Sequence, residues 1–216
     1  MDETIFHLVN ERWTHPALDF FMPLVSYARI WTPFFVVIGI ALVIFGGFRG
    51  RAFVICTLLA LGLSNLLVDP LKNAFGRPRP RQLQTVRMVE LQHTSPEILT
   101  VFKKSRVRFS TEEERSLTGQ SFPSGHVNNN TVIALCCTIF YRRWGKIYWI
   151  ITAAVAYSRI YLAAHWPSDV FATFFLAAGE TLIVLALCEL LWEKIIPLRW
   201  PELVARYPRL LPILPS

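Results

Sequence analysis

Between Arg29 and Arg49 the chain carries no charged side chain, and this stretch constrains the fold more than any other. Most of it reads WTPFFVVIGIALVIFGGF, an almost continuous apolar run. A helix needs about 17–25 predominantly apolar residues to cross the hydrocarbon core of a bilayer. Such a run sits comfortably only in hydrocarbon, so the sequence predicts a membrane-spanning helix here.

Further apolar blocks follow along a chain of 216 residues, and together they define its class. They cover residues 52–68, 127–141, 147–164 and 170–188, while 16–28 is shorter and is broken by Asp19 and Pro23. The chain is 53% hydrophobic and only 17% charged, which excludes a disordered, collagen-like or ordinary soluble protein. We therefore predict an all-α, polytopic membrane helical bundle with five or six transmembrane helices, the sixth being 16–28 if it spans.

The same pattern divides the chain into three parts. Residues 1–28 form the first apolar helices, 29–196 a transmembrane domain with an extended loop at 72–122, and 197–216 a tail. Near the start, Ile5, Leu8, Val9 and Trp13 share one helical face and no cleavable signal peptide is expected. This face suits either a helix in the membrane interface or a helix packed on the rest of the protein.

Basic residues set the expected orientation, because loops on the cytoplasmic side are enriched in Lys and Arg. Three clusters fall on one side of the membrane if the spans alternate, and we place them in the cytoplasm. Residues 72–122 and 165–169 then share the opposite face. The long loop carries ten basic and five acidic side chains, a net charge of +5, against the simple orientation rule, and an anionic substrate is one explanation. The three clusters are Arg49/Arg51, Arg142/Arg143/Lys146, and Lys194 with Arg199, Arg206 and Arg209.

Chemistry-bearing residues concentrate at the non-cytoplasmic ends of the predicted helices. Lys72, Arg79 and Arg159 supply the cations and bidentate donors with which proteins hold phosphoryl oxygens. Ser124 and Gly125 open a helix, where free N–H groups and the helix dipole favour an anion. These residues predict a phosphate-binding site.

Two histidines near these cations are candidates for covalent or acid–base work. They are His126 and His165, and Asp169 follows His165 by four residues, where a carboxylate can orient an imidazole ring. No His/Asp/Glu cluster has metal-ligand spacing, and the four cysteines lie in apolar blocks without CxxC spacing. We expect a site that uses no metal or other cofactor.

Three motifs resemble the signatures of the type 2 phosphatidic acid phosphatase superfamily: K-x6-RP, PSGH and SR-x5-H-x3-D. They read Lys72-x6-Arg79-Pro80, Pro123-Ser124-Gly125-His126 and Ser158-Arg159-x5-His165-x3-Asp169, complete and in the family's order. The resemblance implies a six-helix membrane core and a metal-independent lipid phosphatase with a phosphohistidine intermediate. It implies that His165 is the nucleophile, Asp169 its orienting partner and His126 the general acid. It further implies that the phosphoryl oxygens bind to Lys72, Arg79, Ser124, Gly125 and Arg159.

We therefore expect a multi-pass protein of a bacterial cytoplasmic (inner) membrane with its active site facing the periplasm or exterior. Its partners would be the bilayer and a lipid phosphate or diphosphate, with no nucleic acid. Undecaprenyl diphosphate, phosphatidylglycerophosphate, phosphatidic acid and lipid A 1-phosphate all fit. The alternatives are a lipid-linked phosphotransferase with the same site and, in another class, a membrane transporter.

Three features lie outside the shared motifs. Asn130 follows His126 by one turn, where it either hydrogen-bonds that histidine or is wetted by the cavity. The loop at 81–120 either caps the site and recognises the lipid head group or is a solvated connection between helices. Glu180 lies within an apolar block, which is costly unless it is paired, and Asn65 or a backbone group is the expected partner.

Overall fold

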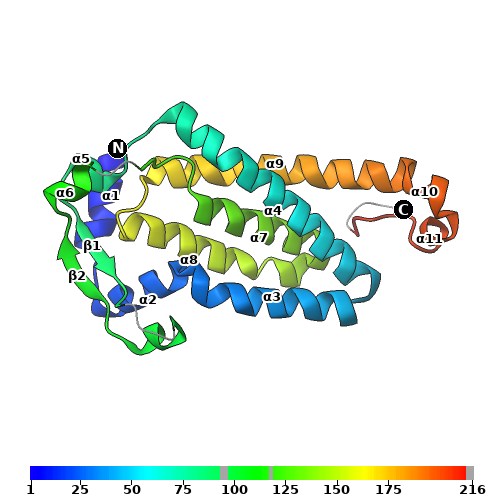
Figure 1. The fold of residues 1–216 in the computed structure, drawn as a ribbon, viewed down its shortest axis with the longest axis horizontal. Coiled ribbons are helices and arrows are strands. Elements are labelled where there is room, and N and C mark those ends of the chain that lie inside the picture. The colour runs from blue at the N-terminus through cyan, green and yellow to red at the C-terminus, as the bar shows by residue number, and fades with distance from the viewer. Residues whose placement is uncertain (93–96, 117–118, 213–216) are drawn as a thin grey trace.

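The computed structural model describes residues 1–92, 97–116 and 119–212, and helices dominate it (Figure 1). The longer helices run side by side along the long axis of the molecule. Helices α4, α7 and α9 share one hydrophobic core, which includes Cys56, Val132, Phe140 and Leu185. The longer helices are α3 (Ala28–Phe45), α4 (Gly47–Phe75), α7 (Gly125–Gly145), α8 (Tyr148–Tyr161) and α9 (Pro167–Lys194).

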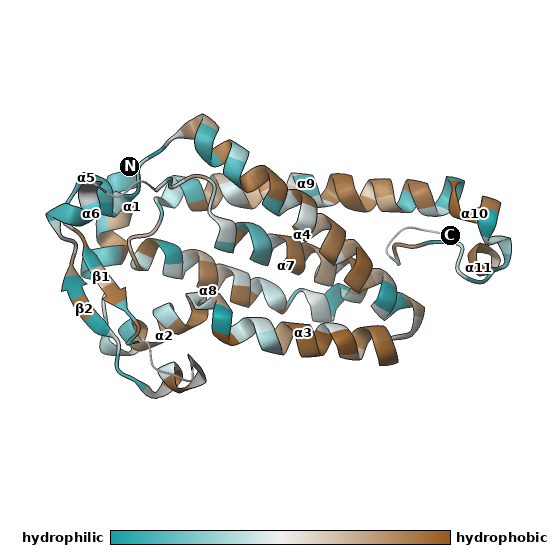
Figure 2. Cartoon of the chain, in the orientation of Figure 1, coloured by the Kyte–Doolittle hydropathy of each residue, from teal (hydrophilic) through white to brown (hydrophobic). Residues whose placement is uncertain are grey.

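Three helical segments in the described part of the chain are long and apolar enough to cross a membrane. They are Ala28–Phe45, Gly47–Phe75 and Pro167–Arg199, and the brown bands of Figure 2 follow them. Helix α3 has no fully buried residue, although Leu42 packs against the main core, so much of its apolar surface is left for lipid. The prediction of a helical membrane bundle is confirmed, whereas the number of spans stays a prediction, because α8 has only 14 residues and α2 (Pro16–Ser26) only 11.

Glycine and proline mark the helix ends that face the site. Helix α4 ends at Phe75 and is capped by Gly76, which has φ +55 and donates its N–H to the carbonyl of Lys72 at 2.8 Å. This left-handed cap is available to glycine without strain and turns the chain sharply after Phe75, about one helical turn beyond Lys72. Helix α9 begins at Pro167, a residue suited to the first helical position. The end of α4 and the start of α9, which both carry motif residues, thus lie at the same end of the bundle (Figure 1).

The loop between α4 and α7 is structured and includes a sheet that the all-α prediction did not contain. Strands β1 (Arg87–Glu90) and β2 (Arg106–Phe109) pair antiparallel, with Arg87 opposite Phe109. Arg108 donates to carboxylates on both sides, Glu90 and Glu114, at 2.5–3.0 Å. These bonds lower the pKa of Glu114 to about 2 and tie the loop together. The remaining elements of the loop are α5 (Pro80–Leu83), η2 (Glu97–Phe102) and α6 (Glu112–Ser116).

The N-terminal segment packs on the rest of the protein. It consists of α1 (Asp2–His7) and the π-helix η1 (Leu8–Arg12). Phe6, Val9 and Asn10 are buried, while Ile5 and Trp13 are exposed. The amide of Asn10 donates to the Arg87 carbonyl and to the carbonyl that ends α8, at 2.9 and 2.8 Å. Of the four residues of the predicted apolar face, Val9 and part of Leu8 therefore pack on the protein, while Ile5 and Trp13 remain exposed.

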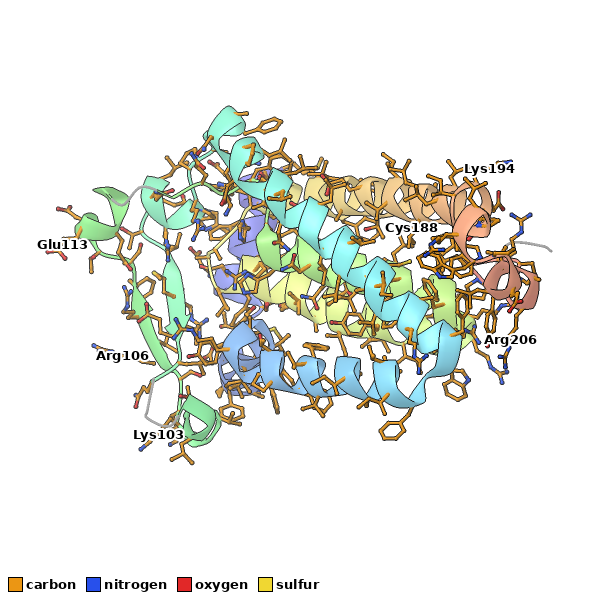
Figure 3. All side chains as sticks on the ribbon, turned by 45° about the vertical axis from the view of Figure 1, so that its right-hand side comes forward. Lys103, Arg106, Glu113, Cys188, Lys194 and Arg206 are labelled. Carbon is orange, nitrogen blue, oxygen red and sulfur yellow. The ribbon has the colours of Figure 1, made fainter. Side chains whose placement is uncertain are left out.

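The opposite end of the bundle holds the C-terminal segment. Helices α10 (Ile196–Arg199) and α11 (Pro201–Arg206) fold back so that Leu211 joins the main core and its N–H donates to Glu189 at 2.8 Å. The turns α3–α4 and α7–α8 lie at this same end (Figure 1). Figure 3 shows Lys194 and Arg206 here and Lys103 and Arg106 at the other end. The three basic clusters used to predict orientation therefore share one end of the molecule.

Candidate active site

The residues of the three motifs meet at the end of the bundle that carries the β1–β2 loop (Figure 1). Helices α4 and α8 end there with Lys72 and Arg159, while α7 and α9 begin there beside Ser124 and Asp169. His165 lies in the turn between α8 and α9. The charges of Lys72, Arg79 and Arg159 all act on the His126 ring. Segments far apart in sequence thus form one cationic pocket.

His165 has a defined tautomer in this pocket. Its side chain is almost fully buried, and its Nδ1 lies 2.5 Å from the carbonyl oxygen of Ser121. A carbonyl only accepts, so Nδ1 carries the proton and Nε2 keeps its lone pair. Burial lowers the pKa of the imidazole well below its usual value, and the charges of Arg159 and Arg79 lower it further. The ring is therefore neutral near pH 7, with a free nitrogen for nucleophilic attack.

Asp169 reaches His165 indirectly. The expected carboxylate–imidazole bond is replaced by Ser121, whose hydroxyl donates to Asp169 Oδ2 at 2.5 Å and whose carbonyl accepts from the His165 ring. The backbone N–H of Trp166 also donates to Oδ2, at 3.2 Å, and Arg77 donates to Oδ1 at 2.6 Å. Ser121 thus links Asp169 to the His165 ring in this structure, and the orienting role of Asp169 stays a prediction.

The cations of the pocket lack strong carboxylate partners among the described residues. Arg159 has a buried Nε with no hydrogen-bond partner. Arg79 donates from Nε to the Gln120 carbonyl at 3.4 Å, and burial lowers the pKa of its guanidinium. Lys72 has a long contact of 3.5 Å with the exposed Asp69. Unneutralised buried cations are costly, so this arrangement suits an incoming anion.

The N-terminus of α7 supplies part of the predicted anion nest. The N–H of Ser124 donates to the Thr173 hydroxyl at 3.0 Å, so this amide is already used. Its hydroxyl is buried without a partner. Gly125 is the first residue of the helix, where amides have no partner within the helix. Ser124 therefore offers its hydroxyl rather than its N–H, while Gly125 offers the free amide that the sequence predicted.

His126 faces a different neighbour from His165. Its Nε2 lies 3.0 Å from the carbonyl of Ser26, the last residue of α2, so Nε2 donates and Nδ1 is left to exchange protons. Asn130 does not bond this ring: its amide nitrogen donates to the His126 backbone carbonyl at 2.9 Å and its oxygen accepts from the Tyr148 hydroxyl at 3.1 Å. Asn130 therefore braces α7 against α8.

A cavity of about 730 Å³ opens beside His126 between α3, α7 and α8. Its walls are mainly apolar, from Trp31, Phe35, Ile151 and Val155, and its inner end is polar at Asn129 and His126. Ligand sites are commonly apolar clefts with a few placed polar groups. This shape fits an elongated amphiphile with its polar end at the histidine.

Two polar features noticed in the sequence have partners in the structure. Glu180 lies 2.6 Å from the hydroxyl of Ser64, which also contacts the oxygen of Asn128 at 2.8 Å. Asn65, the partner expected from sequence, instead donates to the Leu61 carbonyl. Glu180 is thus a structural polar contact between α9, α4 and α7, away from the histidines.

Sequence reasoning missed three residues around Asp169. They are Ser121, Arg77 and Asp2, which contact Asp169 or one another at 2.5–2.6 Å. Arg77 lies inside the first motif and Ser121 two residues before the second, so proximity to the motifs was a usable signal. Nothing in local spacing indicates Asp2, because it meets Arg77 across 75 positions of sequence. Among the described residues, no group of three His, Cys, Asp or Glu side chains could hold a metal ion.

These observations define a helical membrane protein with a cationic, histidine-containing pocket at one end of the bundle. The profile of the PAP2 superfamily matches residues 53–192, well over half of the sequence. The chain therefore belongs to the PAP2 superfamily, the type 2 phosphatidic acid phosphatases that its motifs resemble.

Known relatives agree with this membership. The lipid A 4'-phosphatase of Bacteroides thetaiotaomicron is 26% identical over 160 residues, which cover 73% of this chain and 64% of that protein. The chain thus spans slightly less than two thirds of this curated relative. The LpxE crystal structure from Aquifex aeolicus aligns with a TM-score of 0.58 at 24% identity, covering 86% of this chain and 94% of that one. A transmembrane PAP2-type phosphatidylglycerolphosphate phosphatase from Bacillus subtilis aligns at 0.57 and 23%, over 85% and 82%. These two structures share the fold.

Proposed function

We propose that this protein is a metal-independent membrane lipid phosphatase that works through a phosphohistidine on His165. The observation that carries the proposal is the bond from His165 Nδ1 to the Ser121 carbonyl, which leaves Nε2 unprotonated beside Arg79 and Arg159. A neutral imidazole among unneutralised cations is arranged to attack an anionic phosphorus centre.

The reaction would proceed in two displacements. In the first, Nε2 of His165 forms a bond to phosphorus while the bond from phosphorus to the lipid oxygen breaks. Arg79, Arg159 and Lys72 hold the phosphoryl oxygens and match the charge that develops on them. In the second, water attacks phosphorus, the P–N bond breaks and inorganic phosphate leaves. Every charge of the phosphoryl group is met by protein groups, which is why we expect activity without a divalent ion.

His126 would move the protons in both steps. Because Nε2 donates to the Ser26 carbonyl, Nδ1 is the atom that would exchange protons with the substrate. The negative charge of a bound phosphate favours the imidazolium form, in which Nδ1 also carries a proton. Nδ1 would donate that proton to the leaving oxygen and, once neutral, would accept a proton from the attacking water. Ser26 joins α2 to this ring, and its hydroxyl bonds that of Ser158, next to Arg159. The junction of α2 and α3 therefore helps to place the acid–base residue.

The cavity beside His126 accounts for a lipid substrate. A tail lying between α3 and α8 would contact Trp31, Phe35 and Ile151, while the head group meets the histidines. Because α3 has no fully buried residue, the tail can enter from the bilayer along this helix. The names of the relatives make phosphorylated lipid A the first substrate to test, followed by phosphatidylglycerophosphate.

The test is phosphate release from purified protein in detergent with excess EDTA. The panel contains lipid A carrying a 1- or 4'-phosphate, phosphatidylglycerophosphate, phosphatidic acid and undecaprenyl diphosphate, with His165→Ala as the inactive control. We expect turnover of at least one lipid by wild type and none by the variant. Activity that disappears with EDTA and returns with a divalent ion would contradict the mechanism. Phosphate found on a second lipid instead of in solution would identify a phosphotransferase.

The proposal places the active site on the outer face of a bacterial inner membrane. The support is the shared position of the three basic clusters at the end opposite the histidines. In a chain without native cysteines, Lys104→Cys should react with an impermeant thiol reagent in intact cells and Lys146→Cys only in opened cells. Both side chains are exposed, so the reagent can reach a cysteine at either position. Lys146 is used instead of the neighbouring Gly145, because a side chain at Gly145 would collide with the Cys137 backbone. The reverse labelling would place the site in the cytoplasm.

A further inference from the structure

Arg77 joins the beginning of the chain to the beginning of α9. Its Nη1 donates to Asp169 Oδ1 at 2.6 Å, and its Nη2 donates to Asp2 Oδ2 at 2.5 Å. One guanidinium therefore lies between two carboxylates. Since the guanidinium is planar and its donors are rigidly spaced, fixing one carboxylate restricts the other.

Asp2 has a second anchor on α9. The backbone N–H and the hydroxyl of Ser168 donate to its two carboxylate oxygens, at 2.9 and 2.6 Å. Ser168 belongs to the first turn of α9, where the helix dipole favours a negative charge. Burial alone would raise the pKa of Asp2, but the bonds from Ser168 and Arg77 lower it overall, so Asp2 is charged at neutral pH. Asp2 thus holds both Arg77 and the turn that carries Asp169.

Packing keeps α1 in this position. Phe6 is fully buried and its ring lies 5.3 Å from that of Trp166, which is also buried. The Arg77 guanidinium lies over the same indole, 5.7 Å from its centre, and the indole N–H donates to the Pro78 carbonyl at 3.0 Å. The contacts of Asp2 therefore belong to a packed unit at the site end of the bundle.

This unit is continuous with the nucleophile. Asp169 Oδ2 accepts from the Ser121 hydroxyl, and the Ser121 carbonyl accepts from His165 Nδ1, both at 2.5 Å. An unbroken series of contacts therefore runs from Asp2 through Arg77, Asp169 and Ser121 to the His165 ring. A displacement of the carboxylate would move Ser121 and turn the imidazole.

We propose that helix α1 is a positioning element of the active site, in which Asp2, acting through Arg77 and Asp169, holds the His165 ring in its attacking orientation. The inference rests on the proposed phosphatase function and deepens it. Asp2 contacts neither the phosphoryl pocket nor the tail cavity, so it is a positioning residue that affects the chemical step rather than substrate binding.

The test compares Asp2→Ala with Glu3→Ala, each carrying its purification tag at the C-terminus. Both changes remove one carboxylate from α1, but Glu3 is exposed and forms no hydrogen bond or ion pair with any described residue. Displacement of a catalytic group by about 1 Å can cost about 100-fold in rate, so we expect kcat of Asp2→Ala to fall about 10- to 100-fold. Its KM should stay within about twofold of wild type, and Asp2→Glu should recover part of kcat. Glu3→Ala should match wild type.

Two outcomes would overturn the inference while leaving the phosphatase function intact: an unchanged kcat in folded Asp2→Ala, or a rise in KM alone. If wild type cleaves no lipid, the proposed function fails, and hydrogen exchange then tests the positioning role of Asp2 independently of activity. The Trp166 amide donates to Asp169 Oδ2, so hydrogen exchange over residues 160–167 reports on that carboxylate. This segment should exchange faster in Asp2→Ala than in Glu3→Ala, and equal exchange in the two variants would refute the positioning role.

Discussion

Arg87 in the β1–β2 loop and Arg159 in the pocket are the same type of residue in two neighbouring regions, but their partners differ. Arg87 starts the β1–β2 hairpin and donates to Asp19 of α2 at 2.5 Å, and Asp19 also accepts from the Tyr161 hydroxyl. Arg159 lies in the pocket, and no carboxylate in the described part of the chain pairs with it. A paired arginine stabilises the fold, whereas an unpaired buried one costs stability and suits an anionic ligand. The pocket and the loop above it should therefore respond oppositely to mutation.

The largest effect is expected at His126, inside the pocket. General acid catalysis is typically worth about 100- to 10,000-fold, so His126→Ala should lose that much on an alkyl phosphate such as phosphatidic acid. An aryl phosphate has a leaving group that needs little protonation, so the loss on p-nitrophenyl phosphate should be far smaller. Steady-state kinetics on the two substrates measure this difference, and equal losses would show that His126 is not the acid.

Arg159→Gln tests the unpaired cation. We expect a loss of about 100- to 1,000-fold in kcat, because a preorganised donor to the phosphoryl oxygens disappears. The midpoint of thermal unfolding in detergent should stay constant or rise, since the variant removes a buried charge that lacks a counter-ion. A large fall in that midpoint would mean that Arg159 is needed for the fold.

Arg87→Gln is the matched change in the loop region. Breaking a largely buried ion pair typically costs about 3 kcal/mol, so the thermal midpoint should fall clearly. The fraction that remains folded should keep a kcat within about threefold of wild type, because Arg87 contacts no predicted catalytic group. Activity normalised to folded protein checks this, and a kcat loss as large as that of Arg159→Gln would remove the distinction between the two regions.

The smallest effect is a pH dependence of stability at His165. Its folded pKa is lowered below 6.5, so below that pH the unfolded chain binds a proton that the folded chain does not. Acid should therefore destabilise wild type, with a slope of up to about 1.4 kcal/mol per pH unit from this residue. His165→Asn should lose that contribution, and thermal midpoints between pH 5 and 7 compare the two. Parallel curves would mean that the ring is not held neutral by the fold.

The sequence predicted those parts of the structure that depend on local pattern. Uncharged apolar runs predicted the long helices, and Gly76 and Pro167 lie where glycine and proline favour the end and the start of a helix. The motif residues were expected at one end of the bundle and do lie together there. The β1–β2 hairpin was missed although Val107 and Phe109 alternate with Arg106 and Arg108, because four-residue strands within a charged loop give little periodic signal.

Long-range contacts could not be predicted from the sequence. The spacing of His165 and Asp169 favoured a direct bond, but Ser121, 44 residues before the histidine, takes the ring nitrogen instead. Asp2 meets Ser168 across 166 positions, a pairing that no local rule indicates. Arg108 belongs to the loop that was a candidate for head-group binding, and the structure shows its side chain held between Glu90 and Glu114. In each case a partner distant in sequence determines what the side chain does.

The central claim is that the fold leaves Nε2 of His165 free to form a covalent bond to phosphorus. Wild type mixed with p-nitrophenyl phosphate, quenched rapidly at alkaline pH and digested, can be examined by mass spectrometry for phosphorylated histidine. The account predicts phosphate on His165, attached through Nε2 because Nδ1 donates to Ser121. Phosphate on Nδ1, phosphate on His126, or turnover with no phosphoenzyme in any quenched sample would contradict it.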